Sequence, residues 1–98
     1  MRGLLIATEF AAAMLERAFE LHPQVALRPE PFGALAYHYG TRRLVFLRHL
    51  DIVAVVEALA DHPSLQAALV ACDVAPARWP SFLTALENLE GSDIIRGR

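Results

Sequence analysis

The sequence predicts an α+β domain like a winged helix-turn-helix: a three-stranded antiparallel sheet followed by three helices, with an extra N-terminal helical segment. Apolar residues alternate with a period of two between about residues 24 and 48, and they recur every three or four residues before and after that stretch. Prolines and glycines stand where the period changes. A chain of 98 residues with 55% hydrophobic side chains is long enough for one such domain with its own core.

The first predicted element is an amphipathic helix over residues 3–20. Apolar side chains recur in it at a spacing of four, which places them on one helical face. The helix ends before His22-Pro23, because proline cannot continue the hydrogen-bond ladder and disfavours helical backbone in the residue before it. The residues that define the apolar face are Ile6, Phe10 and Met14.

Three short strands are predicted next, over residues 24–28, 34–39 and 42–48. Two prolines follow the first strand and remove two backbone donors, so the chain bends there. The other two strands form a hairpin across Gly40-Thr41, where glycine supplies the positive φ of a type II′ turn.

The hairpin turn predicts which residues of the last two strands lie opposite each other, starting from Tyr39 opposite Arg42. The face with the larger apolar side chains is expected to be the core face, and the face with small or polar side chains is expected to meet solvent. The expected pairs are Tyr37–Leu44 and Leu35–Phe46 on the core face, and His38–Arg43, Ala36–Val45 and Ala34–Leu47 on the solvent face.

The strand over residues 42–48 lies at the edge of the expected sheet, where its outward backbone donors and acceptors have no partner. Arg42, Arg43 and Arg48 flank its apolar stretch. Arginines in this position either guard an edge against aggregation or attract a further strand from another chain. Both interpretations remain open at this point.

Helical periodicity returns after residue 49. Asp51 and Ser64 are the expected N-caps of two helices, and a third helix begins near Pro80 and ends at Gly91. The expected core stripes are Ile52, Val55, Val56 and Leu59 in the first helix, Leu65, Ala68, Leu69 and Cys72 in the second, and Phe82, Leu83, Leu86 and Leu89 in the third, with the tail of Ile94 and Ile95 packing back on the domain.

No catalytic, metal-binding or cofactor site is predicted. The four histidines lie in separate elements without ligand spacing, and no glycine-rich loop opens a helix to hold a phosphate. The single cysteine, Cys72, cannot form an internal disulfide and is expected to be a buried, inert thiol. Trp79 is expected to pack in the core.

The charge pattern argues against nucleic acid and membranes as partners. The net charge is −2, and the third helix carries carboxylates that would repel phosphates, so DNA binding is disfavoured. Glu9 and Glu16 interrupt the apolar N-terminal stretch, so neither a signal peptide nor a membrane span is expected, and a cytoplasmic location follows. From the residues alone, two functions remain as alternatives to peptide binding at the edge strand: a winged-helix DNA-binding regulator and a structural subunit that self-associates.

The stretch 21–47 resembles the mycofactocin biosynthesis peptide chaperones, which are stand-alone precursor-peptide recognition elements similar to the small chaperone of pyrroloquinoline quinone biosynthesis. The resemblance implies a precursor-peptide recognition domain over residues 21–98, which follows the N-terminal helical segment, 1–20, expected from the apolar spacing. The residues that carry the resemblance are Arg28-Pro29-Glu30-Pro31-Phe32-Gly33-Ala34-Leu35 and Tyr37-His38-Tyr39-Gly40-Thr41-Arg42.

The resemblance implies a binder with no cofactor and no catalytic residues. Such a chaperone captures the leader of the mycofactocin precursor peptide and presents it to a radical SAM (S-adenosylmethionine) maturase, which performs the chemistry. In the wider family, the leader lies as an added strand beside the third strand, in a groove between that strand and the third helix. The edge strand expected from the residues lies at the same place.

A peptide site is therefore expected on the third strand and the third helix. The leader would pair with the backbone of Arg43, Val45 and Leu47, or with that of Leu44 and Phe46 in the other register. The helix residues could instead belong wholly to the core. The candidate site residues are Arg42, Arg43, Leu44, Val45, Phe46, Leu47 and Arg48 on the strand and Phe82, Leu83 and Leu86 on the helix.

Overall fold

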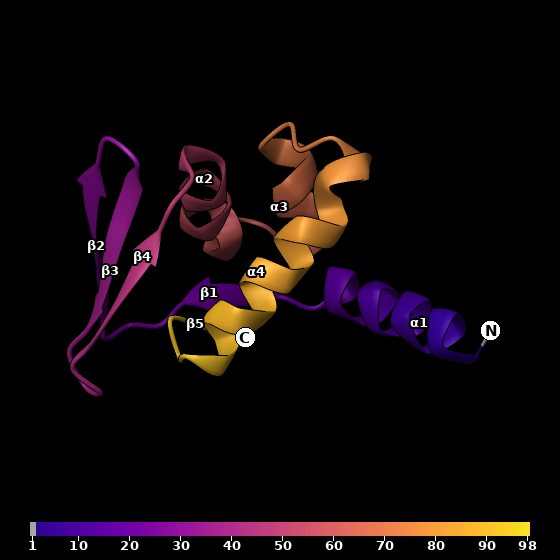
Figure 1. Ribbon diagram of the computed structural model, residues 1–98, viewed down its shortest axis with the longest axis horizontal. Helices are drawn as coiled ribbons and strands as arrows, with labels where there is room; N and C mark the ends of the chain where they lie inside the picture. The colour runs from indigo at the N-terminus through magenta and orange to yellow at the C-terminus, as the bar shows by residue number, and fades with distance from the viewer. Residues whose placement is uncertain (1) are drawn as a thin grey trace.

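Four α-helices and two small antiparallel sheets make up the described part of the protein, which confirms the α+β class (Figure 1). The computed structural model describes residues 2–98, with side chains from residue 9 onward. No helix in this range is long and apolar enough to cross a membrane. In chain order the elements are α1 (Arg2–Glu16), β1 (Phe19–Leu21), β2 (Val25–Glu30), β3 (Gly33–His38), β4 (Arg43–Leu47), α2 (Leu50–Ala58), the 3₁₀ turn η1 (Leu59–Asp61), α3 (Leu65–Ala71), the 3₁₀ turn η2 (Pro76–Arg78), α4 (Trp79–Gly91) and β5 (Ile95–Gly97).

The larger sheet is an antiparallel meander in which β3 lies between β2 and β4. Leu35 lies opposite Phe46 and Tyr37 lies opposite Leu44, so the predicted pairing of the last two strands is confirmed. Ala26 of β2 lies on the other side of Tyr37. The two edges of this sheet are therefore β2 and β4.

The predicted core face of this sheet is wrong. Ala34 and Ala36 are buried, with 1% and 0% of their surface exposed, whereas Leu44 and Phe46 are each 52% exposed. Helix α2 packs against β3 on the face of small side chains. Alanines at these positions let the helix approach the sheet closely, and the larger apolar side chains are left on the opposite, outer face.

The hairpin turn also differs from the prediction. Its positive φ belongs to Arg42 (60°) and not to Gly40. The Arg42 N–H donates to the His38 carbonyl (2.7 Å), and the ring Nδ1 of His38 accepts from the N–H groups of Gly40 (3.0 Å) and Thr41 (3.1 Å). Residues 39–42 thus form a four-residue loop around the buried His38 ring, and the ladder ends before the expected Tyr39–Arg42 pair.

A second, two-stranded sheet pairs β1, which follows α1, with β5, which follows α4. Phe19 of β1 lies opposite Gly97 of β5, and Leu21 lies opposite Ile95. The N-terminal helix therefore ends at Glu16 and not near residue 20. The predicted packing of the C-terminal tail is confirmed, because Ile95 is buried in the core with its neighbours.

The three helices after β4 form the rest of the core with their predicted apolar stripes. Ser64 caps α3 as expected, since its Oγ accepts from the Ala67 N–H (3.1 Å). Asp51 is not the N-cap of α2; it lies in the first turn, and its carboxylate pairs with Arg78 (2.7 Å). Trp79 is half-buried against the core, and its Nε1–H donates to the carbonyl of Val74 (2.9 Å).

Candidate functional site

The two edges of the larger sheet differ in their ability to accept another strand. β2 carries Pro29, which has no N–H to donate. β4 contains no proline, and among the described residues no further strand pairs with its outer side. Its five residues span about 17 Å, enough for a short peptide strand to pair along them.

Hydrogen-bond direction along β3 identifies the free backbone groups of β4. The N–H of Tyr39 donates to the Gln24 carbonyl on the β2 side (2.8 Å). Because successive residues of a strand direct their backbone groups to opposite sides, His38 directs its groups to β4, where Arg43 lies opposite. By the same alternation Val45 and Leu47 also bond to β3, and the outward N–H and C=O groups of β4 belong to Leu44 and Phe46.

A groove runs between β4 and α4, which we call the β4–α4 groove. It consists of three hollows of about 340, 360 and 300 Å³. The first two share His49, Ile52 and Ala85, and the third continues past the start of β4 and the end of α4. Its lining comprises Thr41, Arg43, Val45, Phe46, Leu47, Arg48, His49 and Ile52 on one side and Arg78, Ser81, Phe82, Ala85, Asn88, Leu89, Gly91, Ser92 and Asp93 on the other.

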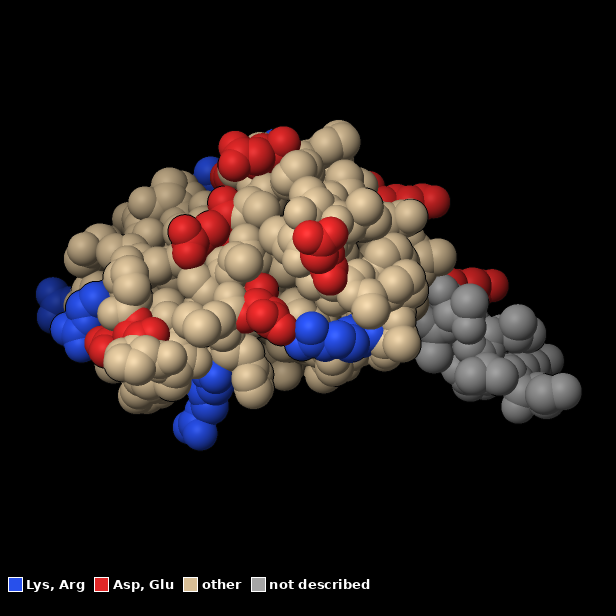
Figure 2. All heavy atoms as spheres, turned by 90° about the horizontal axis from the view of Figure 1, so that it is seen from above, with Lys and Arg blue, Asp and Glu red and all other residues tan. Residues whose placement is uncertain are grey.

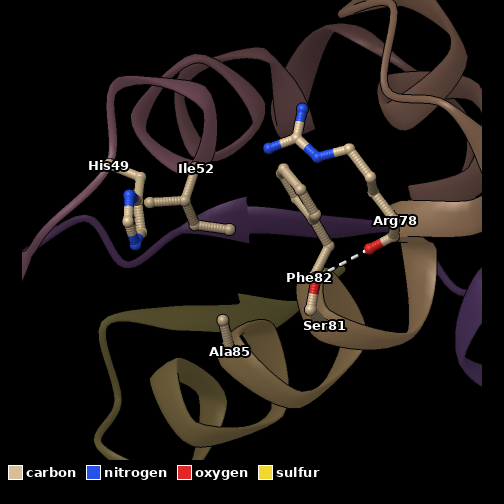
Figure 3. A pocket seen from close by; sticks show the side chains of 6 residues that line it. All are labelled: His49, Ile52, Arg78, Ser81, Phe82 and Ala85. Atoms are coloured by element: carbon tan, nitrogen blue, oxygen red, sulfur yellow. Dashed lines mark hydrogen bonds between the residues drawn. The ribbon is translucent and has the colours of Figure 1, made fainter.

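The first hollow shows how the groove is built (Figure 3). Ile52 and Phe82 form an apolar floor between α2 and α4, and the small Ala85 leaves space beside them. The Arg78 guanidinium lies 5.2 Å from the centroid of the Phe82 ring, and the Ser81 hydroxyl donates to the Arg78 carbonyl (2.9 Å). An apolar floor with polar groups at its rim suits a peptide whose backbone is paired and whose side chains are apolar.

The predicted helix residues fall on two faces of α4. Phe82 lines the groove, whereas Leu83 and Leu86 line none of its hollows and pack in the core. Successive residues turn by about 100° around a helix, so the groove face follows Phe82 with Ala85 and Leu89. The small Ala85 between two large apolar residues at helical spacing is the signal that could have revealed the groove face of α4. The groove residues that were not predicted as site residues are Thr41, His49, Ile52, Arg78, Ser81, Ala85, Asn88, Leu89, Gly91, Ser92 and Asp93.

The predicted strand residues also divide between two surfaces. Val45 and Leu47 direct their side chains to the inner face, where Leu47 is buried and Val45 is half-buried. Leu44 and Phe46 direct theirs to the outer face. Phe46 touches both surfaces, because it lines the groove and also a separate hollow of about 420 Å³ with Phe32 and Arg48.

The arginines around β4 differ from the other arginines with described side chains. Arg17, Arg28, Arg78 and Arg96 each form an ion pair, and Arg98 donates to backbone carbonyls. Figure 2 shows arginines around the sheet end of the molecule and mostly carboxylates over the helical part. Among the described arginines, only Arg42, Arg43 and Arg48 form neither an ion pair nor a side-chain hydrogen bond, and all three flank the apolar stretch of β4.

Groups suited to metal binding or covalent chemistry do not gather at the groove. Within the described range, no three His, Cys, Asp or Glu side chains lie together where they could hold a metal ion. Burial, followed by the nearby charge of Asp73, raises the pKa of the Cys72 thiol. A raised pKa lowers the thiolate fraction, so this cysteine is a poor nucleophile at neutral pH.

The sequence relationships agree with a peptide groove. Residues 18–96, from the end of α1 to β5, match the model of the peptide chaperone MftB family. The chain belongs to this family. It is 46% identical to the peptide chaperone MftB of Mycobacterium ulcerans, over 97% of this chain and 94% of the relative. The MftB chaperones of Mycobacterium tuberculosis (49% identity; 82% and 73% covered) and Mycolicibacterium smegmatis (50% identity; 80% and 76% covered) are also similar.

No solved structure matches the chain. Membership of the MftB family confirms the resemblance to the mycofactocin biosynthesis chaperones and assigns the chain a peptide-chaperone role in that biosynthesis, with a peptide as partner. A peptide chaperone is a binding protein and not an enzyme, in keeping with a groove built from backbone edges and apolar side chains.

Proposed function

We propose that this protein binds the leader of the mycofactocin precursor peptide by β-strand addition at β4 and presents the peptide to a radical SAM maturase. The observation that carries the proposal is the open β4 edge beside the β4–α4 groove. In this arrangement, backbone hydrogen bonds supply affinity for any extended peptide, and the groove supplies selectivity through every second side chain.

The leader strand pairs with the outward N–H and C=O groups of Leu44 and Phe46. Side chains on one face of this added strand then point into the groove, toward Ile52, Phe82 and Leu89. These three residues are at most 8% exposed, so they form a rigid floor that is already packed before the peptide arrives. A preformed floor lowers the ordering cost of binding.

The arginines beside β4 favour a leader that contains acidic residues. Arg42, Arg43 and Arg48 flank the added strand and have no carboxylate partner among the side chains that the structure describes. Exposed charges of this kind mainly accelerate association and select partners, and salt screens them. Leader capture should therefore weaken as ionic strength rises.

Nucleic acid is not a partner in this proposal, although the order of sheet and helices is winged-helix-like. The exposed side of α4 carries Glu87 and Asn88, and no arginine follows Arg78 on that helix. A reading helix of this composition repels phosphates. A mobility shift of duplex DNA at low salt would favour the DNA-binding alternative.

Leu44→Pro tests the strand-addition proposal directly. The outward N–H of Leu44 is removed, while the bonds between β3 and β4 remain, and the chain already carries Pro29 at an outward position on the opposite edge. Binding of a synthetic precursor peptide, measured by calorimetry, should weaken by about tenfold or more, which corresponds to about 1.4 kcal/mol.

Leu44→Ala is the matched control, because it removes the same side chain and keeps the N–H. It should bind the peptide within about threefold of the unmodified protein, a difference below 1 kcal/mol. A folded Leu44→Pro variant, judged by circular dichroism, that binds like Leu44→Ala would exclude strand addition at this edge.

A further inference from the structure

The outer face of the β2–β3–β4 sheet is a second apolar surface, which meets the groove at Phe46. Tyr39 is 62% exposed, and Leu44, Phe46 and Phe32 are also exposed. Tyr37 completes the surface, with its ring in an edge contact to Tyr39 at a centroid distance of 5.1 Å. We call these five residues the outer patch.

The outer patch is ordered by contacts among its own side chains. The rings of Phe32 and Phe46 lie 6.1 Å apart, and the Arg48 guanidinium lies 6.0 Å from the centroid of Phe46. Together these three residues enclose the hollow of about 420 Å³. Contiguous exposed aromatic residues on a small domain usually mark a surface that binds another protein.

We infer that the outer patch is the docking surface for the maturation enzyme that acts on the captured peptide. This inference rests on the proposed function. The docking site on the enzyme should combine apolar side chains with carboxylates, because the charge beside the patch that has no partner of its own is positive. Arg42 and Arg48 lie beside β4 without an ion pair, whereas Arg28, on the same face of β2, is paired with Glu30 (2.7 Å).

A second copy of the chain fits the patch less well. If two outer patches faced each other across a two-fold axis, the arginines around one patch would meet those around the other. Like charges brought together at an interface oppose association. Charge complementarity therefore favours an acidic partner over self-association.

Continuity with the groove connects the patch to peptide capture. Phe46 and Arg48 line both surfaces. A leader strand added to β4 widens the sheet, and the side chains on its other face extend the outer patch. An enzyme seated on the patch thus contacts chaperone and leader together, so it should bind the peptide-loaded chaperone more tightly than the empty one.

The size of the patch predicts a transient complex. Strands in a sheet lie about 4.8 Å apart, and these are about 17 Å long. Even with the leader strand added, the area of this face is less than half of the roughly 800 Å² that each partner buries in a standard interface. Small interfaces of this kind suit partners that associate and separate in each cycle. Transfer of a peptide to an enzyme requires that behaviour.

The test uses a Tyr37→Thr/Tyr39→Ser double variant, which removes two rings of the patch without changing β4. Surface plasmon resonance would measure binding of the purified radical SAM maturase to the chaperone, with and without saturating precursor peptide. We expect the double variant to bind the peptide within twofold of the unmodified protein and the maturase at least tenfold more weakly.

Two further variants keep this test decisive. Val70→Ser with Phe10→Ser removes two exposed apolar side chains away from the patch, on α3 and α1, and it should bind the maturase normally. Arg28→Glu breaks the ion pair with Glu30 and leaves two carboxylates beside the patch, so it should weaken binding of an acidic maturase site even if the tyrosine variant does not fold. The factor by which the peptide raises the affinity for the maturase should equal the factor by which the maturase raises the affinity for the peptide.

The outcomes separate this inference from the proposed function. If the unmodified protein binds no precursor peptide, the proposed function fails, and the inference fails with it. Only the inference fails if the unmodified protein binds the peptide but the peptide-loaded protein does not bind the maturase. The same holds if the tyrosine variant and Arg28→Glu both bind the maturase normally. A dimer in sedimentation velocity that the tyrosine variant abolishes would also overturn the inference, because a second copy would then cover the patch.

Discussion

The two faces of the three-stranded sheet reverse the usual relation between side-chain size and burial. On the inner face Ala34 and Ala36 are fully buried, whereas on the outer face Leu44 and Phe46 are half-exposed. The same two strands supply both faces in the same register. Hydrophobicity alone therefore does not identify the core face of this sheet.

The difference follows from what covers each face. A helix lying on a sheet needs small side chains beneath it for close packing, and α2 lies on the alanines of β3. No element of the described chain covers the outer face, so large apolar side chains remain available there for a partner. The inner face holds the fold together, and the outer face is free to bind.

The largest expected loss of stability comes from a substitution at Gly33, where the start of β3 lies against the backbone at the end of β4. Gly33 has a φ of +153°, and a Cβ added to it would lie 2.0 Å from the carbonyl oxygen of Leu47. Gly33→Ala must therefore displace the end of β4 and should lower the free energy of unfolding by about 3 kcal/mol. Urea denaturation of the purified variant measures this loss.

Gly91→Ala is the control for that substitution. Gly91 is the last residue of α4, and no atom lies within 4 Å of an added Cβ. Alanine is the better helix former, so this variant should be as stable as the unmodified protein, or more stable by up to about 1 kcal/mol. Equal losses in the two variants would mean that the close approach at Gly33 does not matter.

A pair of alanine-to-leucine substitutions compares the two faces directly. Ala36→Leu adds bulk to the inner face under α2 and should cost about 2 kcal/mol of unfolding free energy. Ala26→Leu adds the same bulk to the outer face, opposite Tyr37, and should change stability by less than about 0.5 kcal/mol. Similar denaturation midpoints for both variants would contradict the assignment of the inner face to the core.

The smallest expected effect concerns the loop at the end of the inner face. His38→Phe keeps a ring against His22, whose centroid lies 4.5 Å away, but removes the acceptor for the Gly40 and Thr41 N–H groups. These groups belong to exposed residues and can bond to water, so the cost should be only about 1 kcal/mol. Hydrogen exchange of the two amides should accelerate.

His38→Asn distinguishes loss of the acceptor from loss of the ring. The asparagine carbonyl can accept from a backbone N–H two residues later, so it should restore much of the protection at Gly40. Protection that is lost equally in both variants would show that ring packing, and not the hydrogen bonds, orders the loop.

Local sequence signals predicted much of the fold. Period-two alternation and the Gly40-Thr41 signal predicted the pairing of β3 with β4, although the loop has four residues. The pairing is insensitive to this error, because a two-residue turn closed by Tyr39 and Arg42 and the observed loop closed by His38 and Arg43 produce the same register. The Ser64 cap was predictable for the same reason, since it depends on neighbouring residues only.

The groove was only partly predictable. The edge strand and Phe82 could be named from the sequence, but the groove face of α4 depends on how that helix is rotated against α2 and β4. This rotation placed Leu83 and Leu86 in the core and brought Ala85 and Leu89 to the groove. Ile52 joined them from a different helix, through a contact that no local pattern encodes.

The sequence by itself determined the α+β class, the order of the four helices and the three-stranded meander, the register of β3 with β4 and the family, because each depends on short-range periodicity, turn residues or an extended motif. Only the tertiary structure decided which sheet face is buried, how β1 pairs with β5, and which backbone groups of β4 point outward. These features depend on contacts between residues far apart in the chain. Their packing energies favour one arrangement among several that satisfy the same local preferences.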